Sequence, residues 1–209
     1  MKIWDVSMTI EPSMYVWKGR DSKRPEFTIT RDYVDGEGAR ETHVGMDMHT
    51  GTHIDAPLHF IFEGQTMGSI PLEKLLRQVK VFDLTKIEEV IKASDLAALD
   101  IEQGDFVLFK TRNSLEDIIE SNFIYISSSA AEKLVDLGVE GVGLDALGVE
   151  RDQPDHGTHN ALLGAGVIII EGLRLKEVDQ GQYFMIAAPL KVDSLEAAPA
   201  RVLLTELIK

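Results

Sequence analysis

The chain has 209 residues, of which 44% are hydrophobic, and it carries 35 acidic and 21 basic side chains, a formal net charge of −14. This excess of acid argues against a nucleic-acid-binding protein, because phosphate binding needs a basic face. The chain contains no cysteine, which excludes disulfides, thiolate nucleophiles and Cys-type zinc sites. Any metal ion must therefore be held by His, Asp or Glu.

The length and composition are typical of one globular domain, residues 1–209, because no repeat, low-complexity tract or linker divides them. The longest apolar runs, such as Val167–Ile170, have the length of a strand and are too short to cross a membrane. The first residues, Met1–Asp5, lack the apolar block of a signal peptide. We therefore expect a cytoplasmic protein that acts on a small molecule, with neither nucleic acid nor membrane as a partner.

Turn residues and apolar patterns predict a mixture of strands and helices. In chain order, strands are expected over residues 2–10, 27–30, 107–109, 167–170, 183–187 and 201–207. Helices are expected over residues 72–79, 114–120 and 130–137. The strands and helices follow one another without a clean β-α-β rhythm, so the predicted fold is α+β, or an irregular mixed α/β arrangement.

Two short patterns resemble catalytic motifs but have structural explanations. Ser127–Ser129 offers a candidate nucleophile, yet Ser129 followed by Glu132 fits a capping box at the start of a helix. The glycine-rich run 138–143 follows a predicted helix and precedes a strand, which is the reverse of the order in a dinucleotide-binding loop. We count neither pattern as a site.

Three of the six histidines lie within His49–His59, whose sequence is HTGTHIDAPLH. From residue 43 to residue 60, every His and Asp occupies an odd position, and the even positions hold apolar residues or threonine. This period of two predicts an extended strand with one buried face and one face of titratable groups. The threonines, glycine and proline of the segment disfavour a helix. His43 and Asp47 are expected on an exposed continuation of the strand.

A straight strand cannot bring these side chains to one ion. A rise of about 3.3 Å per residue would separate His49 from His53 by about 13 Å. Ligand atoms must lie within about 2.0–2.2 Å of a shared ion. Gly51 permits a bend or bulge between the two histidines. With that bend, His49, His53 and Asp55 form a predicted triad of two nitrogen ligands and one oxygen ligand.

His59 lies four residues beyond Asp55 and past Pro57, which places it outside the predicted set of direct ligands. An imidazole titrates near neutral pH, so His59 is the predicted catalytic general base or acid. The alternative for the whole segment is a strand whose polar face is merely solvated. Three histidines and an aspartate on one face disfavour that alternative.

A second cluster of polar residues lies downstream. Asp155–His159 holds the two remaining histidines, and the predicted strand 167–170 ends at Glu171. A solvated strand end explains Glu171 equally well. His159 and Glu171 could complete a second metal position with Asp55 bridging two ions, as in many hydrolases, and the periodicity leaves that step open.

Three stretches of the chain resemble one family. HTGTHIDAPLHF, residues 49–60, resembles the signature of the cyclase family, which includes bacterial kynurenine formamidases (arylformamidases) and isatin hydrolases. HNALLGAGVIIIEGL, residues 159–173, resembles the second motif of that family. DVSMTIEPSMYVWKG, residues 5–19, resembles its opening strand and aromatic loop.

The resemblance implies a compact α+β domain of the swivelling β/β/α type, with a mixed sheet or barrel-like core, in homo-oligomers such as dimers or tetramers. The ligands that it implies for a first divalent ion are His49, His53 and Asp55. The ligands that it implies for a second ion are Asp55, His159 and Glu171. It also implies that His59 is catalytic. Trp17 would stack on an aromatic substrate, although a role in the core explains this residue equally well.

The chain departs from the family pattern at three places. Lys18-Gly19 stands where the family commonly has Pro-Gly after the tryptophan. The segment Asp145–Glu150 has Gly148 where the family has serine, and His156 is an additional histidine near the second ion. These departures concern substrate contacts more than metal ligands.

The expected activity is hydrolysis of a formamide or cyclic amide of an aromatic small molecule, such as N-formylkynurenine, which would give kynurenine and formate. Nitrogen and oxygen ligands without sulfur suit Zn²⁺ or Mn²⁺, with one or two ions per subunit. A lyase or ring-closing enzyme on the same metal scaffold is the alternative. A non-catalytic metal-binding protein is disfavoured, because closed structural zinc sites typically use cysteine.

Overall fold

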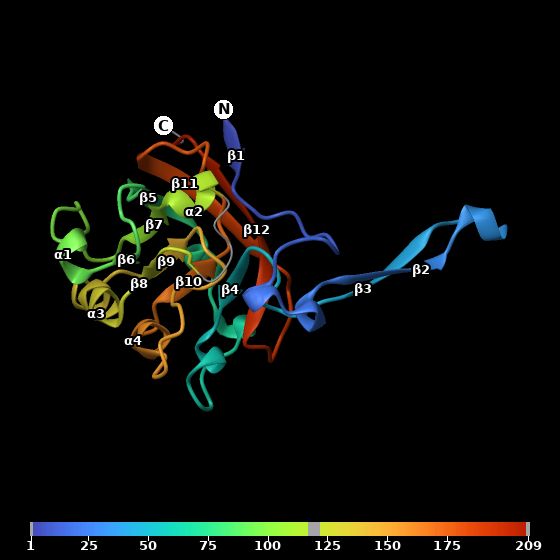
Figure 1. The fold of residues 1–209 in the computed structure, drawn as a ribbon, viewed down its shortest axis with the longest axis horizontal. Helices are drawn as coiled ribbons and strands as arrows, with labels where there is room; N and C mark the ends of the chain where they lie inside the picture. Colours follow the sequence, from blue (N-terminus) through green and yellow to red (C-terminus); the bar gives the residue numbers. More distant parts are fainter. Residues whose placement is uncertain (1, 117–121, 208–209) are drawn as a thin grey trace.

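Eight strands form the main sheet of the computed structural model, which describes residues 2–116 and 122–207 (Figure 1). They are β1 (Ile3–Asp5), β4 (His53–Asp55), β5 (Leu76–Asp83), β7 (Phe106–Lys110), β9 (Gly141–Leu144), β10 (Ile168–Glu171), β11 (Gly181–Pro189) and β12 (Ala197–Thr205). The strand order is β1-β12-β11-β5-β7-β9-β10-β4, and β4 also pairs with β12. The seven strands other than β1 therefore close into a barrel.

The barrel is a mixed sheet. Neighbours among β5, β7, β9 and β10 pair in parallel, whereas β4, β11, β12 and β1 pair antiparallel with their neighbours. Closure removes the open edges that a sheet of this size would otherwise expose. The prediction of a mixed α/β domain with a barrel-like core is confirmed.

The parallel strands are buried on both faces. In β7, Phe106 and Leu108 point into the barrel, and Val107 and Phe109 point outward into a second core beneath the helices. Strands that are covered on both sides have continuous apolar sequences rather than alternating ones. This explains why the apolar runs in this part of the chain carry no period.

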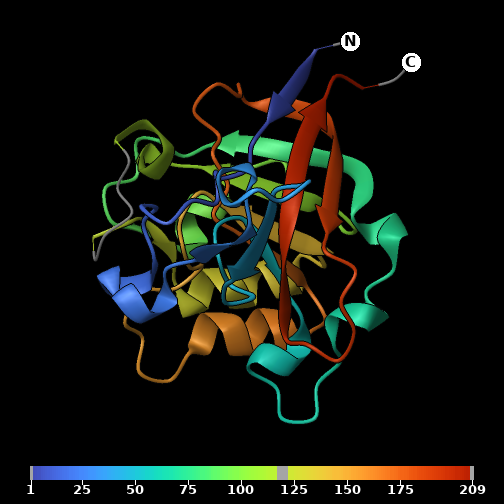
Figure 2. The same ribbon diagram turned by 90° about the vertical axis from the view of Figure 1, so that its right-hand side faces the viewer.

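Helices α3 (Ser128–Asp136) and α4 (Gly157–Gly164) cover the outer face of the parallel strands (Figure 2). A shorter helix, α1 (Ala93–Leu96), and the small parallel pair β6 (Val90–Ile91) and β8 (Tyr125–Ile126) pack into the same outer core. Another short helix, α2 (Arg112–Glu116), follows β7. Single 3₁₀ turns span Trp17–Gly19, Asp21–Lys23, Tyr33–Asp35, Pro57–His59, Met67–Ser69 and Leu72–Lys74. No helix within residues 2–116 and 122–207 has the length and apolar composition that a membrane span needs.

Most of the predicted strands are confirmed, with changed ends. The strands expected over residues 107–109, 167–170, 183–187 and 201–207 correspond to β7, β10, β11 and β12. The expected strand 2–10 is wrong beyond Asp5, because only Ile3–Asp5 pairs with β12. The strand expected over residues 27–30 lies inside the hairpin described below.

The predicted helix 72–79 is wrong. Residues Leu72–Lys74 form one 3₁₀ turn, and β5 begins at Leu76. Val79 and Val81 enter the barrel core at strand spacing, and pairing with β7 and β11 prevails over the helical pattern of apolar residues.

The helix predicted over 130–137 is confirmed as α3, but its cap differs. Ser127 rather than Ser129 is the N-cap, and its Oγ accepts a hydrogen bond of 3.2 Å from the backbone N–H of Ala130. The helix predicted over 114–120 overlaps α2 as far as Glu116, and the rest of it lies outside the described residues.

The glycine-rich run 138–143 has a structural role. Gly141 and Gly143 belong to β9, and a Cβ at Gly141 would overlap the ring of Phe106 inside the barrel. The glycine is needed because the neighbouring strand carries a bulky aromatic side chain on the same face. The rejection of a dinucleotide-binding loop is confirmed for this segment.

A long hairpin projects from the barrel (Figure 1). It consists of β2 (Glu26–Arg31) and β3 (Glu41–Gly45), which pair antiparallel, and every residue of β2 is exposed. The single strand predicted from residue 43 to residue 60 is therefore wrong over 46–52, where the chain leaves the hairpin and turns before β4. It is also wrong over 56–60, where β4 has ended and Pro57–His59 form a 3₁₀ turn. His43 is exposed on β3, as expected.

One face of the hairpin is apolar. Phe27 pairs with Val44 across the two strands, and Ile29 lies two residues along on the same face; all three side chains are exposed. An isolated two-stranded hairpin is at best marginally stable in water. We propose that this face packs against a second copy of the chain in a homo-oligomer.

Replacing Phe27, Ile29 and Val44 by threonine is expected to lower the molecular mass measured by light scattering to that of a monomer. Threonine keeps a high strand propensity, so circular dichroism should remain unchanged. The matched control replaces Thr28 and His43, a cross-strand pair on the opposite face, by serine and should keep the wild-type mass. A monomeric wild type, or an unchanged mass in the triple variant, would contradict the proposed interface.

Candidate metal centre

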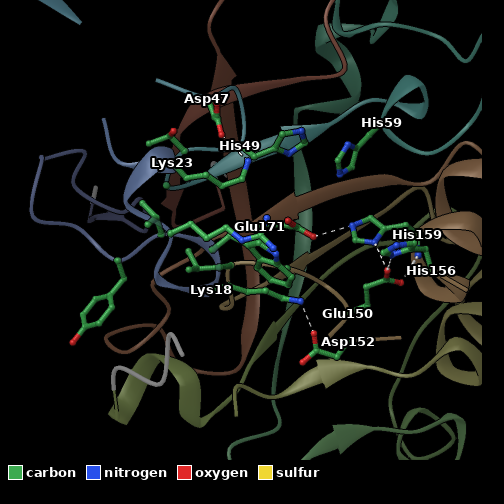
Figure 3. A pocket seen from close by; sticks show the side chains of 18 of the residues that line it. Lys18, Lys23, Asp47, His49, His59, Glu150, Asp152, His156, His159 and Glu171 are labelled. Carbon is green, nitrogen blue, oxygen red and sulfur yellow. Dashed lines mark hydrogen bonds and ion pairs between the residues drawn. The ribbon is translucent and has the colours of Figure 1, made fainter. Parts of the chain in front are cut away.

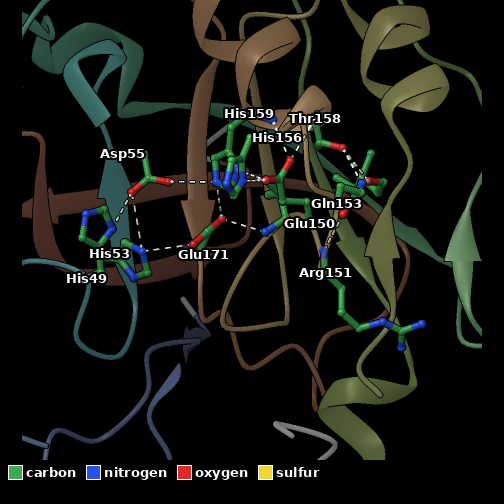
Figure 4. A network of polar contacts seen from close by, with 12 residues as sticks. His49, His53, Asp55, Glu150, Arg151, Gln153, His156, Thr158, His159 and Glu171 are labelled. Atoms are coloured by element: carbon green, nitrogen blue, oxygen red, sulfur yellow. Dashed lines mark hydrogen bonds and ion pairs between the residues drawn. The ribbon is translucent and has the colours of Figure 1, made fainter. Parts of the chain in front are cut away.

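The chain bends at Gly51. Figure 4 shows His49 beside His53 and Asp55, the two outward-facing residues of β4. Gly51 has a φ of 67°, in the left-handed region that favours glycine. The ring centroids of His49 and His53 are 5.0 Å apart, compared with about 13 Å between the two residues in a straight strand. The Gly51 carbonyl accepts a hydrogen bond of 2.9 Å from Nδ1 of His53. The predicted bend is confirmed, and it leaves Nε2 of His53 facing the other polar groups.

Strand β4 separates the core from the site. Ile54 pairs with Ile170 of β10, and both side chains lie in the barrel core. His53 and Asp55 point to the outer face, and His53 pairs across the strands with Glu171. The period of two that the sequence predicted thus holds across β4. The pairing of β4 with β10 places the carboxylate of Glu171, which is distant in sequence, next to His53.

Asp55 is at the centre of the polar cluster (Figure 4). Its Oδ1 lies 3.1 Å from Nδ1 of His49 and 3.5 Å from Nε2 of His53. Its Oδ2 lies 3.7 Å from Nε2 of His159, which α4 contributes. Glu171 joins the two sides, with 3.1 Å to Nε2 of His53 and 3.2 Å to Nε2 of His159. All five predicted ligands therefore lie in one cluster.

The cluster fits a divalent cation. Asp55 is 0% exposed and His53 is 1% exposed. Within the described residues, Nε2 of His53, both carboxylate oxygens of Asp55 and Nδ1 of His159 make no hydrogen bond of normal geometry. Burying such groups without partners is costly. A cation bound by imidazole nitrogens and carboxylate oxygens would satisfy them.

Two sets of three ligand atoms are close enough to share an ion. In each set the atoms lie within 4.8 Å of one another. One set is His53, Asp55 and Glu171. The other set is His49, Asp55 and His59. Asp55 belongs to both sets, so its carboxylate would be shared if two ions were bound.

Charge compensation also shapes the cluster. Burial lowers the pKa of His53, but the adjacent Glu171 carboxylate and the charge of Asp55 outweigh burial and raise this pKa to about 9. Burial and the charge of Asp55 raise the pKa of Glu171, but contacts with His159 and His53 outweigh them and bring it to about 2. At neutral pH the carboxylates are therefore ionised and His53 holds a proton.

His59 lies closer to the cluster than the sequence predicted. The turn Pro57–His59 returns the chain, so the His59 ring centroid is 4.1 Å from that of His49 and 5.6 Å from that of His159. Burial is the largest influence on its pKa, which falls to about 4 although Asp55 opposes the shift. His59 is therefore a neutral imidazole at neutral pH, beside the predicted ligands, and its catalytic role remains a prediction.

Glu150 is a member of the site that the sequence analysis did not identify. It is 4% exposed, and its Oε1 lies 3.2 Å from Nδ1 of His159. Its Oε2 accepts hydrogen bonds from the backbone N–H groups of Thr158 and His159, at 3.1 Å and 3.2 Å. A carboxylate behind a metal-binding histidine fixes the orientation of the ring. No spacing in the sequence connects Glu150 with His159, since only the fold places them together.

A cavity of about 330 Å³ opens onto the cluster (Figure 3). The side chains of Trp17 and Phe60 contribute aromatic walls. Gly148 allows Trp17 to approach, because a Cβ at this position would lie 2.9 Å from the indole ring. Trp17 thus lines the cavity, where the sequence predicted a substrate contact, and the absence of a side chain at position 148 makes room for its ring.

Comparison with known proteins shows the family to which the chain belongs. The family model Cyclase, described as "Putative cyclase", matches residues 4–151, which is more than half of the chain. The chain belongs to the cyclase family. A relative in this family, the kynurenine formamidase of Salinibacter ruber (strain DSM 13855 / M31), is 32% identical over 209 residues, which cover 99% of this chain and 98% of that protein.

Two solved structures share the fold of this chain. One described as "The Structure Of Potential Metal-Dependent Hydrolase With Cyclase Activity" is 50% identical, with a TM-score of 0.93 and coverage of 100% of this chain and 99% of that chain. Isatin hydrolase A from Labrenzia aggregata is 24% identical, with a TM-score of 0.85 and coverage of 98% and 93%, and shows the common fold alone. The predicted family is confirmed, and with it the prediction of a metal-dependent hydrolase.

Binding of a divalent ion to chelator-treated protein is expected to release at least about one proton per chain near neutral pH. His53 has a pKa of about 9, so its proton must leave before Nε2 can bind a cation. Titration calorimetry with Zn²⁺ or Mn²⁺ in two buffers of different ionisation enthalpy measures this release. His53→Ala should lose binding, and His43→Ala, on the exposed hairpin, should keep it. Heats that do not depend on the buffer would contradict the expected release.

Gly148→Ala is expected to lower the free energy of unfolding by about 1–3 kcal/mol, the usual cost of an overpacked site. The added methyl group would press on the indole of Trp17. In a Trp17→Phe background the cost should largely disappear, and denaturant titration of all four proteins gives the coupling. Gly38→Ala is the control, because a Cβ at Gly38 meets open space. An equal cost in both backgrounds would show that Trp17 is not the obstacle.

Proposed function

We propose that the protein hydrolyses the amide bond of an aromatic formamide or cyclic amide, and that N-formylkynurenine, cleaved to kynurenine and formate, is its substrate. The observation that carries the proposal is the buried cluster of imidazoles and carboxylates at the end of a cavity with aromatic walls. The kynurenine formamidase relative, which aligns along almost the whole chain, supports the same chemistry.

The residues proposed to hold the ion are His49, His53, Asp55, His159 and Glu171. Zn²⁺ and Mn²⁺ both suit this nitrogen and oxygen set, with one or two ions per chain. The chemistry that such an ion supplies when bound is Lewis acidity, which makes water a nucleophile near neutral pH. Gly51 and Glu150 support the cluster by holding Nδ1 of His53 and the backbone N–H of His159, respectively.

His59 is proposed to move the proton. Because its pKa is lowered to about 4, the His59 ring is neutral at neutral pH and adds no charge to the cluster. A neutral imidazole accepts a proton from the attacking water, and the resulting imidazolium donates that proton to the leaving nitrogen. Trp17 and Phe60 would hold the aromatic part of the substrate at the cavity walls.

The mouth of the cavity supports a charged substrate. Lys18 pairs with Asp152 at 2.7 Å, and Lys23 pairs with Asp47 at 2.7 Å (Figure 3). Each exposed pair contributes little to stability, so exchanging its partners for a ligand costs little. The amino-acid group of N-formylkynurenine carries one positive and one negative charge, which complement the two members of such a pair. Isatin is a neutral molecule and has no charged groups that could pair with these lysine and aspartate side chains.

The test is a substrate panel with His59→Ala as the diagnostic variant. Metal-loaded wild type should hydrolyse N-formylkynurenine faster than formanilide or isatin. His59→Ala should reduce kcat/KM by about 10²–10⁴-fold, the usual loss for a general acid or base, while elemental analysis finds the wild-type metal content. His43→Ala is the matched control.

The possible failures of this test have different meanings. Unchanged turnover in His59→Ala would reject its role in proton transfer. Loss of metal together with activity would make His59 a ligand, as its distance to His49 and Asp55 allows. A metal-loaded wild type that hydrolyses no member of the panel would reject the amide substrates and favour a lyase or ring-closing reaction.

A further inference from the structure

We propose that His156 hydrogen-bonds a polar substituent on the aromatic part of the substrate and so determines which aromatic amides are accepted. This inference rests on the proposed function and adds to it a residue that selects the substrate. Three observations support it: the left-handed backbone of His156, the hydrogen bond that holds its ring to Glu150, and its position in the lining of the cavity.

The backbone of His156 is strained. Its φ of 49° and ψ of 39° lie in the left-handed region, and it occupies the N-cap position of α4 without a capping hydrogen bond from its side chain. Glycine and asparagine adopt this conformation more readily than histidine. A non-glycine residue held there costs stability and points to a use for its side chain. A purely structural cap would be served better by glycine.

The ring of His156 is anchored on one side and open on the other. Nδ1 donates a hydrogen bond of 2.5 Å to Oε1 of Glu150, the buried carboxylate that also contacts His159. The side chain is nevertheless 54% exposed, and within the described residues Nε2 has no hydrogen-bond partner. A buried carboxylate thus fixes the ring and presents its second nitrogen unpaired.

This ring belongs to the same cavity as the aromatic walls. His156 lines the cavity together with Trp17 and Phe60, as the close view shows for the histidines (Figure 3). The Phe60 ring stacks on His159 at 4.3 Å between centroids and meets the His156 ring at 4.8 Å. An aromatic group bound beside Phe60 therefore has His156 near its edge. Because Nδ1 carries the proton that Glu150 accepts, Nε2 offers a lone pair. An amino or ammonium group on a substituent of that ring can donate to Nε2, whereas an unsubstituted ring cannot.

The experiment compares two formamides that differ in this substituent. N-formylkynurenine carries a side chain with an ammonium group next to the formamide on its ring, and formanilide has an unsubstituted ring. In His156→Gly, the ratio of kcat/KM for N-formylkynurenine to that for formanilide should fall about three- to tenfold, as expected for one lost hydrogen bond. The loss should lie mainly in KM, because His156 is proposed to bind the substrate without transferring a proton.

Stability separates this role from a structural one. Glycine relieves the left-handed strain, so the melting temperature of His156→Gly should equal or exceed that of wild type. His156→Asn, which also tolerates this backbone, serves as a second variant and should show the same change in ratio if its shorter side chain cannot reach the substrate. Metal content should match wild type in both variants.

Three outcomes would overturn the inference. They are an unchanged ratio, an equal fall in kcat for both substrates, and a lower metal content that accounts for the loss. If wild type hydrolyses neither formamide, the proposed function fails separately. In that case the hydrogen bond is tested by calorimetric binding of kynurenine, which keeps the ammonium group of the side chain. A His156→Gly variant that binds kynurenine as tightly as wild type rejects the hydrogen bond.

Discussion

The ionised carboxylate of Asp55, which has no solvent exposure, is the constraint on which the rest of this structure depends. A buried charge needs opposite charge or a cation around it, and the fold supplies three imidazoles from two directions. The strand that carries Asp55 also closes the barrel, because β4 pairs with β10 on one side and β12 on the other. The groups on β4 that are proposed to bind the cation are thus fixed by the same hydrogen bonds that complete the fold. Such a site is pre-organised rather than assembled around its ion.

The surroundings of each histidine give it a different chemical role. Burial lowers the pKa of both His53 and His59. At His53 the contacts with Glu171 and Asp55 outweigh burial and raise the pKa to about 9, whereas at His59 burial prevails over the charge of Asp55 and lowers the pKa to about 4. A pair of similar groups with pKa values separated in this way is typical of acid–base sites. His53 is suited to ligation once its proton leaves, and His59 is in the neutral form that a proton acceptor requires at neutral pH. His156 differs from both, because Glu150 holds its ring at the edge of the cavity.

The features that the sequence could reveal are those encoded within a few residues. The alternation over β4, the bend at Gly51 and the three predicted ligands His49, His53 and Asp55 belong to one short segment, and their geometry follows from strand periodicity and glycine conformation. Glu150 could not be found in this way, since its contact with His159 depends on packing α4 against the barrel. The same limit explains the wrong helix over residues 72–79, where pairing with two distant strands decides the conformation. Nor could the alternation show that the chain leaves the barrel before β4 to form an exposed hairpin.

The most direct test of the central claim is anomalous diffraction from crystals of the protein loaded with Zn²⁺ or Mn²⁺, recorded above and below the absorption edge of the ion. The account predicts a difference peak bounded by His53, Asp55 and Glu171, with a second peak toward His49 where two ions bind. It also predicts that these side chains remain close to the positions described above. Fully loaded crystals with no peak at Asp55, or with the ion held at a different part of the surface, would contradict it.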